Sequence, residues 1–490
     1  MSLPGGGSCA GRCAVEVGAG ERIALEAWPD EGGRFLGWSG RCGGQGACEV
    51  VVEGPGSLKA TFGEACPEPW GLRLGGAGAA VVEQVAVAPG GEVVIAGSFE
   101  DRVEIGGVAL EAGGSAGFVA RFSGQSCGLR WADVIGGAAT GLALDGSGNA
   151  LVAGAFEGAM EVGGRRLEGQ GGRDLYLAKL AGANGAALWL IGAGGAGIER
   201  EGRVAAGAGG RIFWGGAFEG EASAAGGRIV SEGGADVFVA SIRGSDGGRR
   251  WSRRFGGSGD ESLGALAAVE GGVGLAGGFV GRLEPGGLVG AHAGVGAIFA
   301  LGLEGEGGRV SWGAALSSEL GGAATGLASD GAGGAVVSGR IEGAMEIGGG
   351  RIEGGQRQLV ARLRGDGSVA WARSWEGGGV GGEAGPGVVL GEGGEKVFVF
   401  GGLGAAGDLG WGEVSPLGER EVYVVGFDVA EGSALGGRLL GNGGRGQARS
   451  AAAEGGGGVV LVGSFEGEAG ELGDGEAAEG VDGFLIRLEP

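Results

Sequence analysis

The chain has 490 residues, of which 133 are glycine, and its formal net charge is −23 at pH 7. That charge argues against nucleic acids and anionic membranes as partners, because both require basic patches on the protein. The glycines follow no three-residue period and proline numbers only 10, which excludes collagen. A hydrophobic content of 43% argues against a disordered chain.

The sequence predicts neither a membrane span nor an export signal. It contains no run of about 18 apolar residues, the length that a transmembrane helix needs. Residues 1–8 lack the basic start and the apolar stretch of a signal peptide. We therefore expect no membrane insertion, although the cysteines described next favour an extracellular location.

Residues 1–64 predict a small β module. Short apolar runs alternate with clusters of Gly, Pro and Asp, a pattern typical of short strands. A module this small has a thin core that disulfides commonly reinforce. Four cysteines form two close pairs, Cys9 with Cys13 and Cys42 with Cys48. Zinc is the alternative, but these spacings without a nearby histidine fit a zinc site poorly, so the pattern favours disulfides and an oxidising compartment.

The same segment resembles the divergent B-repeat modules of bacterial surface proteins, which are related to the repeats of internalin B. The resemblance covers residues 7–62 and rests on these runs: Cys13-Ala-Val-Glu-Val, Gly20-Glu-Arg-Ile-Ala-Leu-Glu-Ala, Phe35-x2-Trp38-Ser-Gly-x-Cys42, Cys48-Glu-Val and Ala60-Thr-Phe62. It implies a bacterial surface or secreted protein in which this module is a spacer or adhesive element without catalytic chemistry.

After a Pro-containing linker at residues 63–69, tryptophans recur at intervals of 58 to 62 residues. We name them the tryptophan ladder: Trp70, Trp131, Trp189, Trp251, Trp312 and Trp371. A seventh position falls at Gly436, and four of the rungs read Trp-x4-Gly-Gly. Self-similarity at a fixed period indicates one structural unit repeated in an array. We expect the indoles to serve as packing and not as a ligand platform.

The second period shows the parts of one unit. Apolar strands are predicted at residues 141–145, 150–156 and 175–180, and a fourth strand carries Trp189. Hairpin turns fall at residues 146–149 and 183–185, and residues 157–172 form a Gly-rich excursion with a short strand at 160–162. Helical periodicity is absent. Four antiparallel strands repeated radially predict an all-β fold of propeller blades.

Three positions that recur in every unit, here called columns, support a count of seven units. A glycine recurs inside each second strand, which indicates a close backbone approach: Gly97, Gly154, Gly216, Gly277, Gly339, Gly401 and Gly463. Two residues later an apolar side chain recurs: Phe99, Phe156, Phe218, Phe279, Ile341, Leu403 and Phe465. The third strands contribute Phe118, Tyr176, Phe238, Phe299, Leu359, Tyr423 and Phe484. Both apolar columns are interpreted as core.

The ends of the chain predict how the array closes. The last unit has three strands, whereas residues 70–74 form a fourth strand that no other three precede. We expect residues 68–75 to complete the last unit, which removes exposed sheet edges. The prediction is a seven-bladed β-propeller over residues 65–490, closed by its N-terminal strand, after the module at 1–64.

Residues 68–490 also resemble a bacterial seven-bladed propeller repeat family found in predicted cell-surface proteins. The matching residues are 145–154, 174–180 and Trp131-x4-Gly-Gly, and the likeness is most specific in the first three units. The fourth unit, with Val273-Gly-Leu-Ala-Gly, and the sixth, with Gly404-Ala-Ala-Gly, depart from it. The resemblance implies no catalytic residues.

Residues able to carry chemistry are few. His292 is the sole histidine, and no serine nucleophile motif or phosphate loop accompanies it, so no catalytic residue and no cofactor is predicted. A glutamate follows the second strand in five units, and we name these five the acidic ring: Glu100, Glu157, Glu219, Glu342 and Glu466. A solvated loop position, a cation or ligand ring that would include calcium, and a catalytic carboxylate pair all remain open. Asp145 and Asp330 precede hairpins, where turn stabilisation is favoured over calcium.

Two further cysteines, Cys66 and Cys127, each stand four residues before a ladder tryptophan. A bond between them would lock the closure of the ring and stabilise it by about 2–4 kcal/mol. The alternative is that their strands lie too far apart, since bridged Cα atoms lie within about 7 Å of each other.

The sequence therefore favours a monomeric, non-catalytic scaffold, extracellular or at the cell surface, that presents a propeller face to a protein or carbohydrate. The alternative is a propeller enzyme of the lyase or glycosidase type. That enzyme would need Asp, Glu, Arg or Tyr side chains from different blades to converge at the central channel. Three or more carboxylates meeting there would favour the enzyme, and dispersed polar residues would favour the scaffold.

Overall fold

The computed structural model describes residues 18, 20–25, 33–40, 48–51, 58–64, 70–76, 78–124, 127–285, 287–290, 294–377, 385–441, 443–468 and 477–488. The chain divides into two compact units, Met1–Trp70 with Phe122–Gly128, and Gly71–Arg121 with Leu129–Pro490. The regular elements of the described residues are β-strands and one 3-10 turn, Ala208–Gly210, so the prediction of an all-β fold is confirmed. No described helix has the length and apolarity that crossing a membrane would require.

The smaller unit contains four short strands, β1 (Arg22–Leu25), β2 (Gly33–Gly40), β3 (Cys48–Val51) and β4 (Leu58–Glu64). Strand β1 pairs antiparallel with β3, and β2 pairs antiparallel with β4. The side chains of Cys9, Cys13, Cys42 and Cys48 lie outside the described part of the chain, so their disulfides stay a prediction.

The larger unit is a series of antiparallel groups of four strands. The first three are β6 (Ala80–Val87), β7 (Val93–Ile105), β8 (Val108–Phe122) and β9 (Leu129–Ile135); β10 (Ala138–Leu144), β11 (Ala150–Val162), β12 (Arg165–Leu180) and β13 (Ala187–Gly195); and β14 (Arg200–Gly207), β15 (Arg211–Ala224), β16 (Gly227–Arg243) and β17 (Arg249–Phe255). The next are β18 (Ser262–Val269), β19 (Gly272–Val280), β22 (Gly296–Glu304) and β23 (Val310–Leu316); and β24 (Gly321–Ser329), β25 (Ala335–Glu342), β28 (Gln356–Leu363) and β29 (Val369–Glu376).

The last two groups are β30 (Gly387–Leu390), β31 (Lys396–Leu403), β34 (Glu421–Asp428) and β35 (Ala434–Leu440); and β36 (Arg445–Ala453), β37 (Val459–Glu468), β38 (Ala477–Leu488) and β5 (Gly71–Leu74). Short hairpins β20–β21 (Arg282–Leu283, Leu288–Val289), β26–β27 (Met345–Ile347, Gly350–Ile352) and β32–β33 (Gly407–Asp408, Glu413–Val414) separate the second and third strands of three groups.

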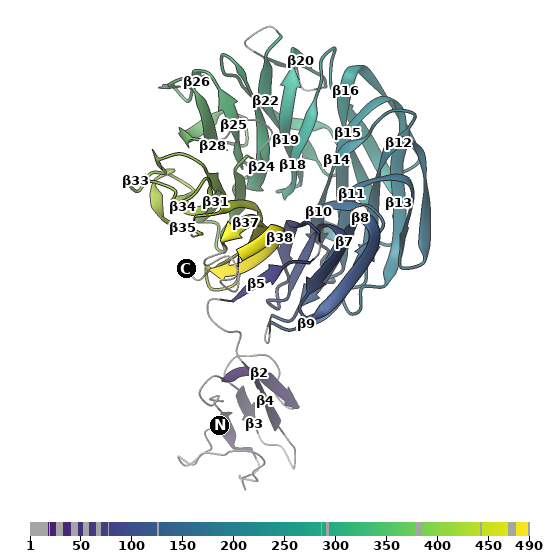
Figure 1. Ribbon diagram of the computed structural model, residues 1–490, viewed down its shortest axis with the longest axis vertical. Helices are drawn as coiled ribbons and strands as arrows, with labels where there is room; N and C mark the ends of the chain where they lie inside the picture. Colours follow the sequence, from purple (N-terminus) through teal and green to yellow (C-terminus); the bar gives the residue numbers. More distant parts are fainter. Residues whose placement is uncertain are drawn as a thin grey trace. The chain divides into compact units, whose positions relative to one another are not determined.

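The groups stand around a common centre (Figure 1). The first strand of each group contacts the first strand of the next, in the order β6, β10, β14, β18, β24, β30 and β36, and β36 contacts β6 again. A closed, radial set of four-stranded antiparallel sheets is a β-propeller. The predicted strands of the second period are present as β10 to β13.

The pairing that closes the ring joins the two ends of the larger unit. Strand β5 pairs antiparallel with β38, with Leu74 opposite Gly483 and Gly71 opposite Ile486. The chain therefore completes its last sheet with a strand from its beginning, as the unmatched terminal strands predict. The edge of β38 is thereby covered, and β5 becomes the outer strand of that sheet.

The Gly-rich excursions are the main correction to the sequence interpretation. Residues 157–172 are not an irregular loop, because β11 and β12 continue through them as one long hairpin that passes a β-bulge near Glu157. Met160 and Val162 bury their side chains from this hairpin. We name the outer part of such a hairpin the arm. Glycine and charged residues on its exposed side obscure the alternation of apolar and polar residues that would indicate a strand in the sequence.

The arms join neighbouring groups. The arm of β15 pairs with the end of β13 in the preceding group, with Gly194 opposite Ser223. Isolated bridges make the same kind of connection between Gly75 and Glu104 and between Gly256 and Glu284. Each arm therefore extends the sheet before it, which merges β10 to β17 into a single eight-stranded sheet.

The two apolar columns form the core between sheets. Their members from the second and third strands are buried, and they meet in edge-to-face or tilted ring pairs, of which Phe279 with Phe299 is one, with centroids 6.3 Å apart. The glycine column explains how the strands come so close. A Cβ at Gly154 would collide with the carbonyl oxygen of Ala138, beside a β-bulge in β10. First-strand carbonyls stand equally close to Gly97, Gly277, Gly339 and Gly463.

The ladder indoles connect consecutive groups. In four of the six, the Nε1–H donates to a backbone carbonyl oxygen of the following group, over 2.9 Å for Trp131 to Gly182, 3.2 Å for Trp189 to Gly244, 3.0 Å for Trp251 to Gly305 and 2.8 Å for Trp371 to Val429. The ring of Trp251 lies against Gly308. The positive φ of 65° at this residue and the lack of room for a Cβ beside the indole both favour glycine. The tryptophans thus lie between sheets and not on an open platform.

We predict that Gly154→Ala destabilises the protein by about 1–3 kcal/mol or more, since the new methyl group must displace backbone. Chemical denaturation checks the loss. Gly146→Ala is the matched control in the same hairpin, because a Cβ there meets only open space. Equal stability of the two variants would contradict the close approach.

We predict that Trp251→Phe loses about 1 kcal/mol more stability than Trp214→Phe. Both changes shrink a buried ring, but only Trp251 donates a hydrogen bond from its indole N–H, whereas the buried Nε1 of Trp214 has no partner among the described residues. The midpoints and slopes of urea denaturation curves give the difference. Indistinguishable losses would show that the indole hydrogen bond adds nothing to packing.

Candidate functional site

The structure does not gather the acidic ring into one site. The five glutamates lie where the second strands leave the core, and three of them pair with arginines of their own group: Glu157 with Arg173 at 3.2 Å, Glu219 with Arg200 at 2.9 Å and Glu466 with Arg445 at 3.8 Å. Among the described residues, no three His, Cys, Asp or Glu side chains gather closely enough to hold a metal ion. The positions therefore behave as partly or fully solvated, charge-paired sites. His292 lies outside the described residues.

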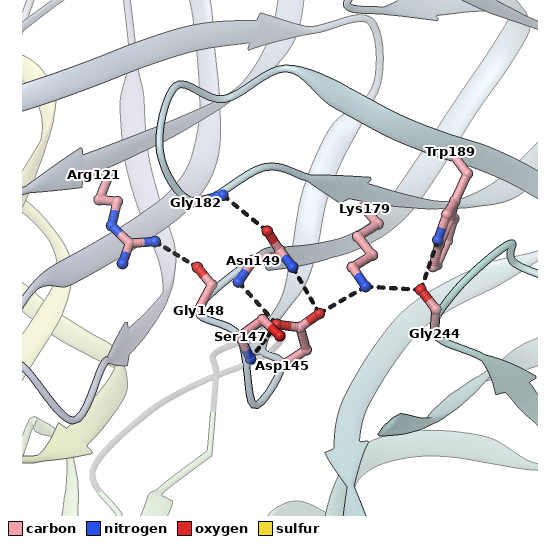
Figure 2. Close-up of polar contacts among 9 residues, drawn as sticks. All are labelled: Arg121, Asp145, Ser147, Gly148, Asn149, Lys179, Gly182, Trp189 and Gly244. Atoms are coloured by element: carbon pink, nitrogen blue, oxygen red, sulfur yellow. Dashed lines mark hydrogen bonds and ion pairs between the residues drawn. The ribbon is translucent and has the colours of Figure 1, made fainter. Parts of the chain in front are cut away.

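The best-ordered polar cluster surrounds the turn between β10 and β11 (Figure 2). Asp145 Oδ1 accepts hydrogen bonds from the backbone N–H groups of Ser147 at 2.9 Å and Asn149 at 3.0 Å, which closes the turn. Its Oδ2 accepts from Asn149 Nδ2 at 3.0 Å and lies 2.7 Å from Lys179 Nζ on β12. The Lys179 ammonium thus neutralises the Asp145 carboxylate.

The same lysine reaches the next group. Lys179 Nζ donates to the carbonyl oxygen of Gly244 at 2.7 Å, and that oxygen also accepts from the indole of Trp189 (Figure 2). Burial alone would raise the pKa of Asp145, but hydrogen bonds from Lys179, Asn149 and Ser147 outweigh it and hold that pKa below its usual range. The cluster is an ion pair inside one sheet that also bonds to its neighbour.

Three other groups repeat this arrangement. An acid in the first hairpin pairs with a base on the third strand in Glu92–Arg121 at 2.6 Å, Asp330–Arg362 at 3.0 Å and Glu454–Arg487 at 2.7 Å. Arg121 also donates to the carbonyl oxygen of Gly148 and Arg362 to that of Val429, both in the following group. Turn stabilisation at Asp145 and Asp330 agrees with the sequence interpretation, whereas the contacts between groups were not predicted.

A second set of acids was missed in the sequence. Two residues before the third-strand aromatic, four groups carry a buried carboxyl group, and we name these the third-strand acids: Asp174, Asp236, Glu421 and Asp482. The signal was available, because each acid stands at the start of the apolar run of its third strand, at the same distance from the aromatic column. Asp482 is neutralised by Arg73 of β5, whose Nε donates to Oδ2 at 2.6 Å.

Two third-strand acids face a second buried acid. Asp174 lies beside Glu199, and Asp236 lies beside Glu261; all four side chains are at most 2% exposed. Burial, followed by repulsion from Asp174, raises the pKa of Glu199 to about 7. Burial raises the pKa of Glu261 to about 7 as well, with the charge of Asp236 adding to the effect.

The repeated Gly-Gly dipeptide makes room for these contacts. A Cβ on the first glycine would meet a third-strand acid, as at Gly75 with Asp482, Gly194 with Asp174 and Gly256 with Asp236. A Cβ on the second would meet a carbonyl oxygen of an arm, as at Gly195 with Glu221 and Gly257 with Arg282. The Trp-x4-Gly-Gly motif is therefore a structural signature of the junction between groups.

Around the centre, polar side chains bond to the backbone of the adjoining first strand. Arg203 Nε donates to Gly264 O at 2.9 Å and its guanidinium also donates to Thr140 O at 3.3 Å, so it touches the groups on both sides. Burial lowers the pKa of Arg203, and the charges of Glu201 and Glu83 oppose that effect. These polar groups are dispersed and do not form a cluster of carboxylates.

Of the six cysteines, the structure describes the side chain of Cys127, which is disulfide-bonded. Its partner is not among the described side chains, and Cys66 lies outside the described residues. A Cys66–Cys127 bond therefore stays a prediction.

We predict that Lys179→Met destabilises the protein by about 3–5 kcal/mol, because it leaves the Asp145 carboxylate nearly buried without its cation. The depressed pKa of Asp145 also means that this stabilisation is present above pH 4 and is lost as the pH falls through the lowered pKa. Denaturant unfolding at pH 7 measures the loss. Arg228→Met, which breaks the exposed Arg228–Glu221 pair, is the control with an expected change of about 0–1 kcal/mol; equal effects would contradict a role between sheets.

Comparison with known proteins supports the assignment of the N-terminal module. Residues 3–66 match the family described as the divergent InlB B-repeat domain, which confirms the resemblance seen in the sequence. No curated protein is significantly similar to the chain. Similar solved structures include BamB from Moraxella catarrhalis, with 12% identity over 95% of this chain and 98% of that chain at a TM-score of 0.37. The polysaccharide lyase Uly1 has 9% identity over 87% and 91% at 0.44, and the Dos1 propeller has 9% over 85% and 94% at 0.40. At these scores the fold assignment rests on strand pairing, and no function transfers to this chain.

Proposed function

We propose that the chain is a non-catalytic scaffold, outside the bacterial cell or on its surface, that binds a protein or carbohydrate through a propeller face. In this proposal the strand groups are the blades of a seven-bladed propeller over residues 65–490, closed by β5, and residues 1–64 are a disulfide-stapled spacer. The match of residues 3–66 to the divergent InlB B-repeat domain supports the surface location.

The observation that supports the non-catalytic role is that the repeated polar residues make structural contacts. The third-strand bases and the ladder indoles bond from one group to the next, and the hairpin acids pair with those bases inside their own group. The paired third-strand acids are at most 2% exposed, too deep to touch a substrate. Catalysis needs titratable groups that converge on an accessible point, and the described acids near the centre, Glu83 and Glu201, flank an arginine.

The same contacts support the proposed seven-blade count and the proposed monomeric state. The ring of first strands returns from β36 to β6, and β5 covers the open edge of β38. A ring that closes within one chain leaves no strand edge that a second copy must cover.

The full-length protein should bind immobilised glycans or surface proteins saturably and leave soluble polysaccharides intact. Array binding followed by titration measures the affinity, and reducing-end and unsaturated-uronide assays on the same polysaccharides measure cleavage. We expect binding to be unchanged by a calcium chelator, because Lys179 neutralises Asp145 in the turn that most resembles a calcium loop. Heat-denatured protein is the control. Cleavage that a single active-site substitution abolishes would overturn the proposal and favour a propeller lyase or glycosidase.

A further inference from the structure

Two junctions between strand groups bury a pair of acids where an ion pair would be expected. At the first junction, Asp174 extends from β12 and Glu199 immediately precedes β14 of the following group. At the second, Asp236 extends from β16 and Glu261 immediately precedes β18. The two junctions are related by the repeat, since both members of the pair recur 62 residues later.

The oxygen atoms of these pairs are incompletely bonded. Asp174 Oδ2 accepts from Gln170 N at 2.6 Å, and Asp236 Oδ2 accepts from Glu232 N at 2.9 Å and from Arg254 at 2.6 Å. Glu261 Oε2 accepts from Gly257 N at 3.0 Å. The remaining oxygens, Asp174 Oδ1, Asp236 Oδ1, Glu261 Oε1 and both of Glu199, are buried without a partner among the described residues.

Neutralising charge near the pairs is limited. Around Glu199, the charge of Glu219 adds to that of Asp174, and Glu219 bonds to Arg200 at 2.9 Å. Around Asp236 and Glu261, Arg254 is shared between Asp236 and Glu232, and Asp260 accepts from Ala235 N. Ionising both of two buried, facing carboxyl groups is costly, and a proton on one of them supplies a donor for an oxygen that has none among the described residues.

We propose that each pair binds one proton in mildly acidic solution and that this proton forms a carboxyl–carboxylate hydrogen bond joining two neighbouring strand groups. The ring is then a proton-dependent assembly at these two junctions, and it loosens when the protons leave in alkaline solution. Asp482 provides an internal contrast to Asp174, because an arginine, Arg73, forms an ion pair with Asp482.

The direction of the pH effect follows from linkage. The pKa of Glu199 and of Glu261 is about 7 in the folded protein, above the ordinary value of 4.5. Between these pH values the folded state holds more protons than the unfolded chain, so the free energy of unfolding falls as pH rises from 4.5 to 7 and levels off above it. Few other groups titrate in that range, because the chain has a single histidine, His292.

The test compares full-length His292→Gln protein with the same protein carrying Glu199→Gln and Glu261→Gln. Glutamine keeps the shape and replaces the protonated acid with a permanent N–H donor. Thermal denaturation from pH 5 to 8 should show a falling melting temperature in the parent and a nearly flat one in the variant, with the variant more stable at pH 8. The control is Glu157→Gln with Glu304→Gln, two exposed glutamates, which should keep the slope of the parent.

Infrared spectroscopy detects a protonated carboxyl group directly, which a purely structural role of these acids would not produce. The parent should show a protonated-carboxyl band at pH 6 that fades with a midpoint near pH 7 and is missing from the glutamine variant. A flat parent profile, an unchanged slope in the variant or the lack of the band would overturn the proposal. So would calcium stabilisation at pH 8 in the parent but not in the variant, since the pairs would then hold a cation.

Discussion

A four-stranded sheet cannot enclose a core by itself, so every sheet in this protein depends on the junction with the next one. The junction is made largely by groups that cross it: an indole N–H and a third-strand base both donate to backbone carbonyls of the following group. Backbone carbonyls are acceptors that no substitution removes. The repeats can therefore drift in sequence while one tryptophan and a few glycines preserve the contact between sheets.

Much of the fold was predictable from spacing alone. The strand order, the hairpins and the pairing of the first strand with the last follow from the tryptophan ladder and the glycine column, because these positions have one physical role in every repeat. The arms were misinterpreted as excursions. Their apolar residues, such as Met160 and Val162, alternate over a few positions among glycines and charged residues, so local patterning is too weak to reveal that β11 and β12 continue through this segment.

The candidate sites were less predictable from the sequence than the fold was. The acidic ring was visible in the sequence because its glutamates recur after a strand, yet recurrence on the outside of a core produces dispersed charges. The third-strand acids stand at the start of the apolar runs and have greater physical consequences, because burial makes their charge costly. Asp482 meets Arg73 of β5 within its own sheet. Asp174 instead meets Glu199 of the following group, and that contact is information that one repeat does not contain.

The pairing of β5 with β38 also determines when the ring can close during synthesis. Arg73 and Asp482 are 409 residues apart in the chain, so at roughly 5–20 residues per second β5 waits about 20–80 s for its partner to be made. During that time the ring is open, with one unpaired strand at each end of the growing array. Because β5 closes the ring by pairing with β38, only a chain synthesised through β38 can close it. A chain that stops early keeps an open sheet edge that other proteins can pair with.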